Sequence, residues 1–173
     1  MVSGSRKVLA VIRLNVGCGP DLKKDWINID HVAQKTNYDF VCQNILEPFR
    51  TPPADFILIN HVLCTMNYQN ALEVLKNAHI ALKAGGKLQV IDMDLLKAFD
   101  SYNFNPNELP IKSGSDDYKL CMHISGFSTR MSLYTPRLLK ELLLITGFRE
   151  VVVLGNSEHD LRPLESVIVE ATK

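Results

Sequence analysis

The sequence predicts an α/β fold built on a mostly parallel sheet with an antiparallel ending. Short apolar runs of strand character alternate with amphipathic helical patterns along the chain. One run, Asp55–Asn60, is almost continuously apolar, as expected for a strand that is covered on both faces of a parallel sheet. The last two strand-like runs are separated by turn residues alone, which favours an antiparallel hairpin at the C-terminus.

Size and charge limit what the chain can be. Its 173 residues suit a single domain over 1–173, and they are enough to bury a core without a metal or a disulfide. Lysine plus arginine equals aspartate plus glutamate, at 19 each, so no overall field attracts nucleic acid. Val8–Ile12 is too short to cross a bilayer. The four cysteines form no C-x-x-C pair, so we expect no metal site and a reducing, cytoplasmic location.

The first part of the chain predicts four strands in succession. Arg13–Val16 runs into Gly17-Cys18-Gly19-Pro20, a strand ending in a tight turn. The next strands are Trp26–Asp30, the weaker Tyr38–Cys42, and Asp55–Asn60. Too few residues separate the first two strands for a full crossover helix.

The second part predicts helices between strands. We expect a helix over Asn70–Lys83, stopped by Gly85-Gly86, and a helix that begins after the cap Thr135 with Pro136 and stops at Gly147. The predicted strands are Lys87–Met93, Phe148–Leu154 and Ser166–Glu170. Residues 101–132 are irregular, and a segment of this length favours a lid or a substrate-side loop over a connector that only covers the sheet.

The turn after the first strand is the strongest functional signal. Glycines there let a ligand approach the backbone closely, and an acidic residue at the end of the second strand, Asp30, suits ribose hydroxyls. A dinucleotide fold would need a third glycine where Leu22 stands, and an acidic residue about twenty positions on, whereas Asp30 follows Gly19 by eleven. A tight turn in an α/β domain of another function stays open on this motif alone.

The combination of motifs resembles the class I S-adenosylmethionine-dependent methyltransferases, in a short single-domain branch. The resemblance covers nearly the whole chain through LNVGCGP, WINID, DFILINHVL, LKAGGKLQVIDMDL, HISGF, LYTP and DLRP, which begin at Leu14, Trp26, Asp55, Leu82, His123, Leu133 and Asp160. It implies a Rossmann-like, doubly wound, seven-stranded sheet with an antiparallel C-terminal hairpin and a shortened first helix. It also implies S-adenosyl-L-methionine as the cofactor.

The resemblance assigns roles position by position. The turn Val16, Gly17, Cys18 and Gly19 would hold the methionine part of the cofactor, Asp30 the ribose, and His31 would lie against adenine. Asn44 would bond the adenine amino group, the Ile45 amide a ring nitrogen, and Asn60 with His61 would close the site near the sulfonium. The candidates for a catalytic base are His61 and His123, while His79 and His159 are expected in solvent. Arg130 and Tyr134 are further candidates for substrate contact.

Two departures from the family pattern keep a second function open. Asn44 stands where many members have an acidic residue, and Cys64-Thr65 stands where the family often has Glu-His. The function that the resemblance implies is methyl transfer to a small-molecule acceptor. The alternative is an S-adenosylmethionine-binding protein without strong catalysis, in a regulatory or interaction role, and a lyase or aminopropyl transferase is a third use of the fold. Neither nucleic acid nor membrane insertion is expected, and the choice between monomer and homodimer is open.

Overall fold

A single seven-stranded sheet organises the molecule, in the order β3-β2-β1-β4-β5-β7-β6. The computed structural model describes residues 11–95, 97, 132, 134–155, 157–160 and 166–173. The strands are β1 (Arg13–Val16), β2 (Ile27–Asp30), β3 (Phe40–Cys42), β4 (Ala54–Asn60), β5 (Leu82–Met93), β6 (Arg149–Leu154) and β7 (Ser166–Thr172). β1 to β5 pair in parallel, and β7 inserts antiparallel between β5 and β6. The predicted mostly parallel sheet with an antiparallel ending is confirmed.

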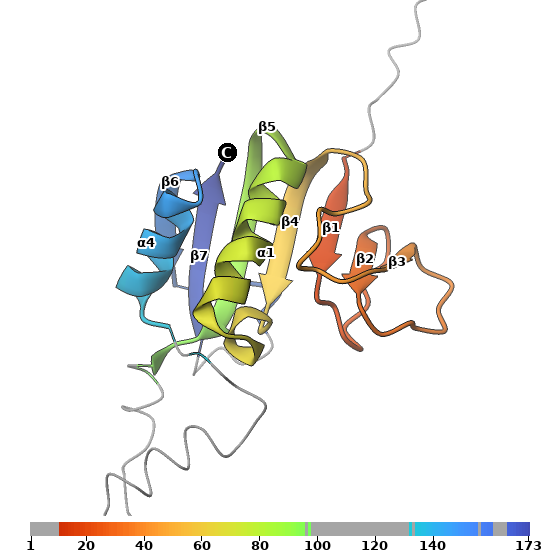
Figure 1. The fold of residues 1–173 in the computed structure, drawn as a ribbon, viewed down its shortest axis with the longest axis horizontal. Helices are drawn as coiled ribbons and strands as arrows, with labels where there is room; N and C mark the ends of the chain where they lie inside the picture. Colours follow the sequence, from red (N-terminus) through yellow and green to blue (C-terminus); the bar gives the residue numbers. More distant parts are fainter. Residues whose placement is uncertain (1–10, 96, 98–131, 133, 156, 161–165) are drawn as a thin grey trace, which may run out of the picture.

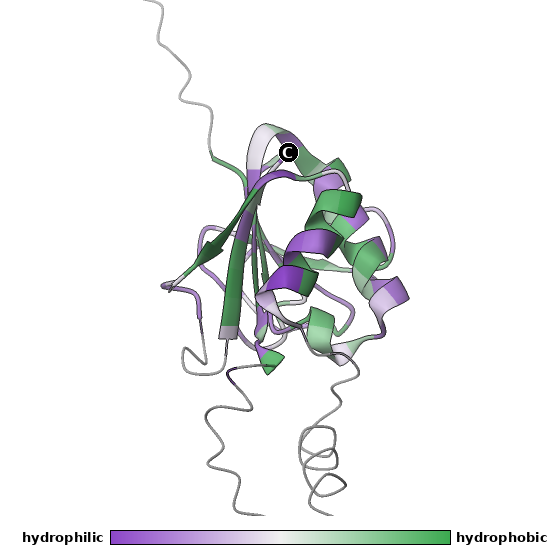
Figure 2. Ribbon diagram, turned by 90° about the vertical axis from the view of Figure 1, so that its left-hand side faces the viewer, coloured by the Kyte–Doolittle hydropathy of each residue, from purple (hydrophilic) through white to green (hydrophobic). Residues whose placement is uncertain are grey.

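Helices α1 (Tyr68–Ala81) and α4 (Pro136–Ile145) lie on the same side of this sheet (Figures 1 and 2). Each begins at a side-chain cap, because Asn67 accepts from the Asn70 amide and Thr135 accepts from the Leu138 amide. Pro136 occupies the first turn of α4, where its missing N–H costs nothing. A short 3₁₀ helix, η1 (Leu63–Thr65), joins β4 to α1.

The stop of the first long helix was predicted wrongly. Helix α1 ends at Ala81, and Leu82 is already extended, with φ −75° and ψ 144°. Gly85 and Gly86 lie inside β5 instead of closing the helix. There they exchange backbone hydrogen bonds with Lys173: the Gly85 amide donates to the Lys173 carbonyl, and the Lys173 amide to the Gly86 carbonyl.

Turns and irregular segments alone make the connections in the first half of the sheet. Residues 17–26, 31–39 and 43–53 contain no helix, so the predicted shortening of the first helix is complete. A chain of ten residues between two adjacent parallel strands cannot form a crossover helix and still reach the next strand. The loops that follow β1 and β2 therefore stay close to the ends of their strands.

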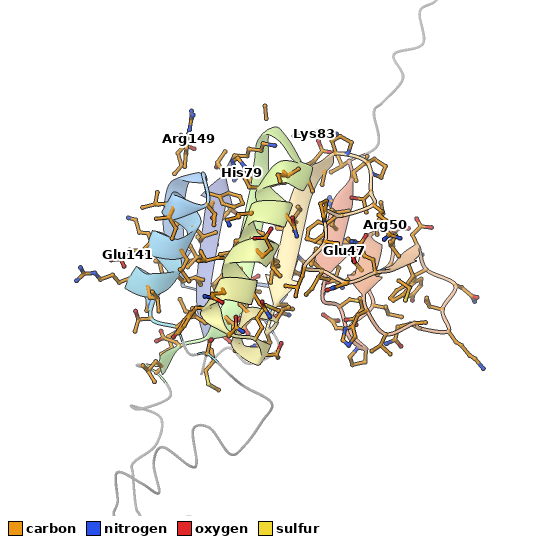
Figure 3. All side chains as sticks on the ribbon, viewed as in Figure 1. Glu47, Arg50, His79, Lys83, Glu141 and Arg149 are labelled. Atoms are coloured by element: carbon orange, nitrogen blue, oxygen red, sulfur yellow. The ribbon has the colours of Figure 1, made fainter. Side chains whose placement is uncertain are left out.

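Apolar packing is unequal on the two faces. The main cluster lies between the sheet and the helices, with Ile57 and Ile59 of β4 and Leu139 and Leu143 of α4 fully buried. A smaller cluster on the other face consists of Trp26, Leu58, Ile91 and Ile168. Charged side chains such as those of Glu141 and Arg149 project outward at the periphery (Figure 3). No helix of the described ranges is long and apolar enough to cross a membrane.

The predicted lid and two predicted site residues lie outside the described residues. The proposed lid, 101–132, falls outside the described residues except for Ser132, and His123, Arg130 and Cys121 fall outside them with it. Of the other cysteines, Cys18 and Cys64 are buried as small apolar residues, whereas Cys42 on β3 is exposed.

Candidate functional site

A cavity of about 420 Å³ opens at the carboxyl ends of β1, β2 and β4. This is the edge of an open α/β sheet where ligands bind. Its lining combines residues predicted from the sequence with others from η1 and the first turn of α1: Gly17, Asp30, His31, Asn44, Ile45, Leu46, His61, Val62, Thr65, Met66 and Asn70. The structure thus gathers most of the predicted cofactor residues around one space.

Of the glycine turn, Gly17 lines the cavity and Gly19 does not, and the two glycines also differ in their surroundings. Gly17 has φ +67°, and a Cβ there would lie 2.6 Å from Cγ2 of Val62. Gly19 has φ +49°, but a Cβ there would meet nothing within 4 Å. Gly17 is therefore required by both conformation and space, whereas Gly19 is required by conformation alone. The open space over Gly19 is what a ligand that lies on the backbone needs.

Asp30 is fixed at the end of β2 by backbone donors. Its Oδ2 accepts from the Gly19 amide at 2.9 Å, and its Oδ1 accepts from the Val32 amide at 3.0 Å. The ring of His31 lies 3.1 Å from Oδ1 through Nδ1 and is largely exposed. A carboxylate has about four acceptor positions, so Asp30 keeps acceptor capacity toward the cavity.

Asn44 and Ile45, which follow β3, line the same cavity as this carboxylate. The side-chain oxygen of Asn44 accepts from the Leu46 amide at 3.0 Å, which leaves its NH₂ group on an exposed side chain. The Ile45 carbonyl accepts from the side chain of Asn77 on α1 at 3.3 Å. This hydrogen bond attaches the loop after β3 to α1, although Ile45 and Asn77 are 32 residues apart in the sequence.

His61 has an unusual backbone and an inward-facing ring. Its φ is +53°, a left-handed conformation that non-glycine residues rarely adopt and that concentrates at functional sites. Nε2 lies 3.4 Å from Ser166 Oγ and 3.9 Å from Asp160 Oδ1, and Ser166 Oγ donates to Asp160 at 2.9 Å. The Nδ1 atom is buried as well. The ring nitrogens thus face the protein interior more than the cavity.

Beneath His61, a buried carboxylate organises η1. Asp92, near the end of β5, is fully buried and accepts from the backbone amides of Cys64 at 3.1 Å and Met93 at 2.8 Å. Burial raises the pKa of the Asp92 carboxyl to about 6, against the lowering effect of these donors. The Tyr134 hydroxyl donates to the Leu63 carbonyl at 3.1 Å on a fully buried ring, so Tyr134 secures η1 and does not line the cavity.

Some predicted residues lie outside the cavity lining. Val16 is buried in β1, and the Asn60 side chain donates to the His159 carbonyl at 2.7 Å on the far side of the sheet. Cys18 is buried, and burial followed by the nearby Asp30 charge raises the pKa of its thiol to about 11. A thiol with that pKa is protonated at neutral pH and is a poor nucleophile.

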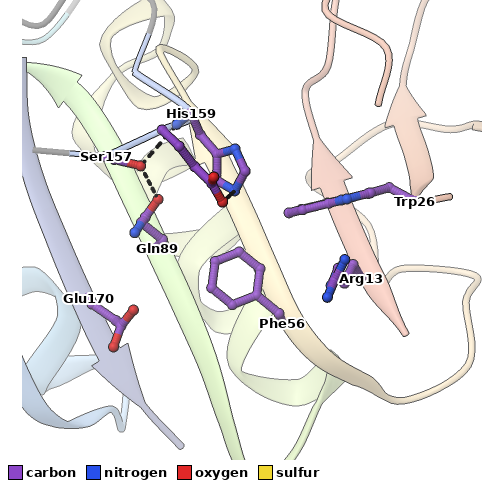
Figure 4. A pocket seen from close by; sticks show the side chains of 8 residues that line it. Arg13, Trp26, Phe56, Gln89, Ser157, His159 and Glu170 are labelled. Carbon is purple, nitrogen blue, oxygen red and sulfur yellow. Dashed lines mark hydrogen bonds and ion pairs between the residues drawn. The ribbon is translucent and has the colours of Figure 1, made fainter. Parts of the chain in front are cut away.

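A larger depression, about 720 Å³, lies on the sheet face opposite the helices (Figure 4). The Trp26 ring meets the rings of Phe56 and His159 there nearly edge to face, and the Arg13 guanidinium lies 5.8 Å from the Trp26 ring centroid. None of the predicted site residues that the structure describes lines this depression, and His159, which was expected in solvent, does. The candidate cofactor site is the smaller cavity, because it alone of the two lies at the strand ends.

The expectation of solvated histidines is wrong for both His79 and His159. The His159 ring packs against Trp26, with centroids 5.3 Å apart, and the His79 ring against Phe148 at 5.0 Å. Burial lowers the pKa of each imidazole. Their partners are 133 and 69 residues away in sequence, at Trp26 and Phe148, so no local pattern indicates them.

Sequence reasoning missed five residues of the cavity lining: Leu46 follows β3, and Val62, Thr65, Met66 and Asn70 follow β4. A signal for one of them existed, since Asn67 and Asn70 fit the start of a helix and a helix N-terminus often faces a ligand site. Val62 is recognised only by its contact with the Gly17 position.

Comparison with known proteins shows the fold. A methyltransferase from Archaeoglobus fulgidus, described as S-adenosylmethionine-dependent, is 14% identical, with a TM-score of 0.63 over 94% of this chain and 86% of its own. Human N-acetylserotonin methyltransferase, in complex with S-adenosylmethionine, is 17% identical, with a TM-score of 0.58 over 94% of this chain and 47% of its own. A protein described as a pericyclic reaction enzyme is 16% identical, with a TM-score of 0.59 over 99% and 45%.

The chain thus has the Rossmann-like fold of the class I S-adenosylmethionine-dependent methyltransferases, as its motifs predicted. It spans most of the archaeal protein but about half the length of the other two. No protein-family model and no curated protein matches the sequence.

Proposed function

We propose that this chain binds S-adenosylmethionine in the cavity at the ends of β1, β2 and β4 and directs its methyl group to a small-molecule acceptor. The observation that carries the proposal is the Asp30 carboxylate, fixed by the Gly19 and Val32 amides beside an open glycine turn. This arrangement offers acceptors for a ribose next to backbone that a ligand can approach closely. The fold of the similar structures supports the same reading.

Each wall suits one part of such a ligand. Asp30 would accept from the ribose hydroxyls, and Gly17 and Gly19 would leave room for the methionine part. Asn44 and the Ile45 amide would read the edge of adenine, while the ring of His31 would cover it. Val62 and Met66 supply apolar surface to the cavity. The polar ends of the ligand would thus be bound at separate strand ends.

The chain's task in catalysis would be alignment and exclusion of water. S-adenosylmethionine supplies a methyl group that is already activated on a sulfonium. Holding an acceptor in line can lower a barrier by about 7–11 kcal/mol without an acid or base. A base is needed only for an acceptor whose proton has a high pKa, and His61 and His123 are the sequence candidates for it.

Calorimetry with a matched pair of variants tests the binding. Asp30→Asn removes the carboxylate charge but keeps an acceptor for the Gly19 or Val32 amide, whereas Asp39→Asn makes the same change at an exposed site before β3. We expect Asp30→Asn to weaken S-adenosylmethionine about tenfold or more, which is the loss of one charge-assisted hydrogen bond. Asp39→Asn should bind like the native chain. Equal affinities in all three proteins would refute the assignment of Asp30.

A second candidate is a chain that binds the cofactor without transferring its methyl group. Two observations favour it: the His61 ring nitrogens face inward, and a pericyclic reaction enzyme shares the fold. Incubation with cofactor labelled in the methyl group and a panel of amine, thiol and hydroxyl acceptors separates the two. Label transfer supports the methyltransferase; calorimetric binding without transfer supports this candidate; absence of binding refutes both.

A further inference from the structure

Three side chains with metal-binding donors converge beside the cofactor cavity. His61 follows β4, Cys64 lies in η1, and Asp92 lies near the end of β5. One donor atom from each lies within 4.8 Å of the other two. Cys64 and Asp92 are buried, and the His61 side chain is 16% exposed. No sequence motif indicates this set, because Asp92 is far from the other two along the chain.

The donors match those of one class of cation. An imidazole nitrogen, a thiolate sulfur and a carboxylate oxygen are the ligands that zinc uses in proteins. Three protein ligands and one open position describe a catalytic rather than a structural zinc site. Tetrahedral coordination at the usual bond lengths places donor atoms about 3.3–3.8 Å apart. Closing the present set therefore needs a shift of about 1 Å, which side-chain rotation of Cys64 and His61 can supply.

The carboxylate is already held in place. Asp92 Oδ2 accepts from the Cys64 amide and Oδ1 from the Met93 amide, at 3.1 and 2.8 Å. These bonds fix the carboxylate on the side of η1, while a carboxylate has about four acceptor positions and keeps capacity for an ion. The backbone amide and the thiol of Cys64 thus lie against the same carboxylate, which brings two ligands together without a rearrangement of the fold.

His61 also has the partners that a metal-bound histidine needs. Its Nε2 faces Ser166 Oγ at 3.4 Å and Asp160 Oδ1 at 3.9 Å, and the Asp160 and Ser166 side chains are buried. A histidine that binds a metal through one nitrogen almost always donates from the other to a carboxylate or a similar acceptor. With Nδ1 as the ligand, Ser166 and Asp160 would fill that role and orient the ring.

We propose that His61, Cys64 and Asp92 bind one zinc-class divalent cation, with Asp160 and Ser166 orienting the histidine. His61 lines the cofactor cavity, so the ion would lie at its border. The fourth position would take water, which the ion would make easier to deprotonate. The site stands on its own residues and does not depend on S-adenosylmethionine binding.

Cobalt is the probe for this site, because a cobalt–thiolate bond gives an intense near-ultraviolet charge-transfer band. The full chain is stripped with a chelator and titrated with Co²⁺, then with Zn²⁺. We expect a band that saturates at one equivalent and that Zn²⁺ abolishes. Cys64→Ser should remove it, whereas Cys42→Ser, at the exposed cysteine of β3, should leave it unchanged. No saturable band in the native chain, or a band that survives Cys64→Ser, overturns the proposal.

Further variants protect this test against misfolding and against confusion with the cofactor. If Cys64→Ser fails to fold by circular dichroism, His61→Gln takes its place and should weaken cobalt binding strongly. Asp160→Asn should weaken it about tenfold or more, as loss of an orienting carboxylate does. Asp30→Asn should leave the cobalt titration unchanged while it weakens S-adenosylmethionine. Native-like cobalt affinity in both His61→Gln and Asp160→Asn would refute the ligand set.

Discussion

The two halves of the sheet are stabilised in different ways. α1 connects β4 to β5 and α4 lies between β5 and β6, and both helices pack on an apolar cluster that continues to Leu14 and Val16 of β1. β1 to β3 are connected by irregular segments, and buried polar side chains tie those segments down: Asn28, Asp30 and Gln43 each bond backbone groups of neighbouring loops. The predicted cofactor residues come mainly from β1 to β3 and from the irregular segments that follow these strands.

The difference shows how the part of the site at β1 to β3 is built without helices after those strands. A loop that is only 10 residues long cannot bury an apolar face of its own, so its backbone groups need other partners. Asn28 has no exposed surface, and Gln43 is 5% exposed, so their amides can serve as fixed partners. Substitutions that destabilise the half of the sheet with β1 to β3 should therefore also weaken ligand binding. Substitutions that destabilise the half with β4 to β7 should leave ligand binding unchanged.

The largest effect is expected from Leu139→Ala. Leu139 is fully buried between α4 and the sheet, and removing such a side chain costs about 4 kcal/mol of unfolding free energy. Urea denaturation measures the loss, with Leu144→Ala, which is 48% exposed, as the control that should cost little. S-adenosylmethionine affinity of the folded variant should be unchanged. A parallel loss of affinity would break the distinction between the halves.

Asn28→Ala tests the other half. Its side chain accepts from the Lys23 amide and from Asn15, and it donates to the carbonyls of Lys23, Trp26 and Asp39. We expect a loss of about 3 kcal/mol, because several buried groups lose their partner. Unlike Leu139→Ala, this variant should also bind S-adenosylmethionine more weakly when it is still folded. Unchanged affinity would show that the loops keep their shape without Asn28.

The two glycines of the turn allow a finer comparison. Both have positive φ, so alanine costs about 1–2 kcal/mol at either position. At Gly17 the new Cβ also meets Val62 at 2.6 Å, which adds about 2 kcal/mol of overpacking. Gly17→Ala should therefore be about 2 kcal/mol less stable in urea than Gly19→Ala. Equal stabilities would mean that Val62 moves aside without cost.

The smallest expected effect is on the pH dependence of stability, at the contact between His159 and Trp26. Burial first, and the Lys23 charge second, lower the pKa of His159, whose ring packs on Trp26. The unfolded chain therefore takes up this proton at a higher pH than the folded chain does. The contribution of His159 to the unfolding free energy, measured as the difference between the native chain and His159→Gln, should be constant above the ordinary histidine pKa of about 6.5 and should fall as the pH drops below it. A difference that does not change with pH would assign the pH dependence to another group.

Much of the fold could be predicted because its signals are local. The glycine turn, the cap Thr135 and the strand runs are each recognised within a few residues, and the structure confirms the predicted strands and the cap. The end of α1 was missed because Gly85-Gly86 is a common helix stop, and only pairing with Lys173 shows that these glycines belong to β5. Boundaries depend on such partners more than on propensity.

The sequence by itself determined the order of strands and helices, the turn at Gly17 and Gly19, and Asp30 beside it. Only the tertiary structure decided what surrounds His61, since Ser166 is 105 residues away and reaches it because β7 inserts beside β5. The same holds for Asp92 and Cys64, 28 residues apart, and for Val62 against Gly17. The physical reason is that a local pattern fixes conformation, whereas the sheet's strand order fixes which distant side chains share one buried space.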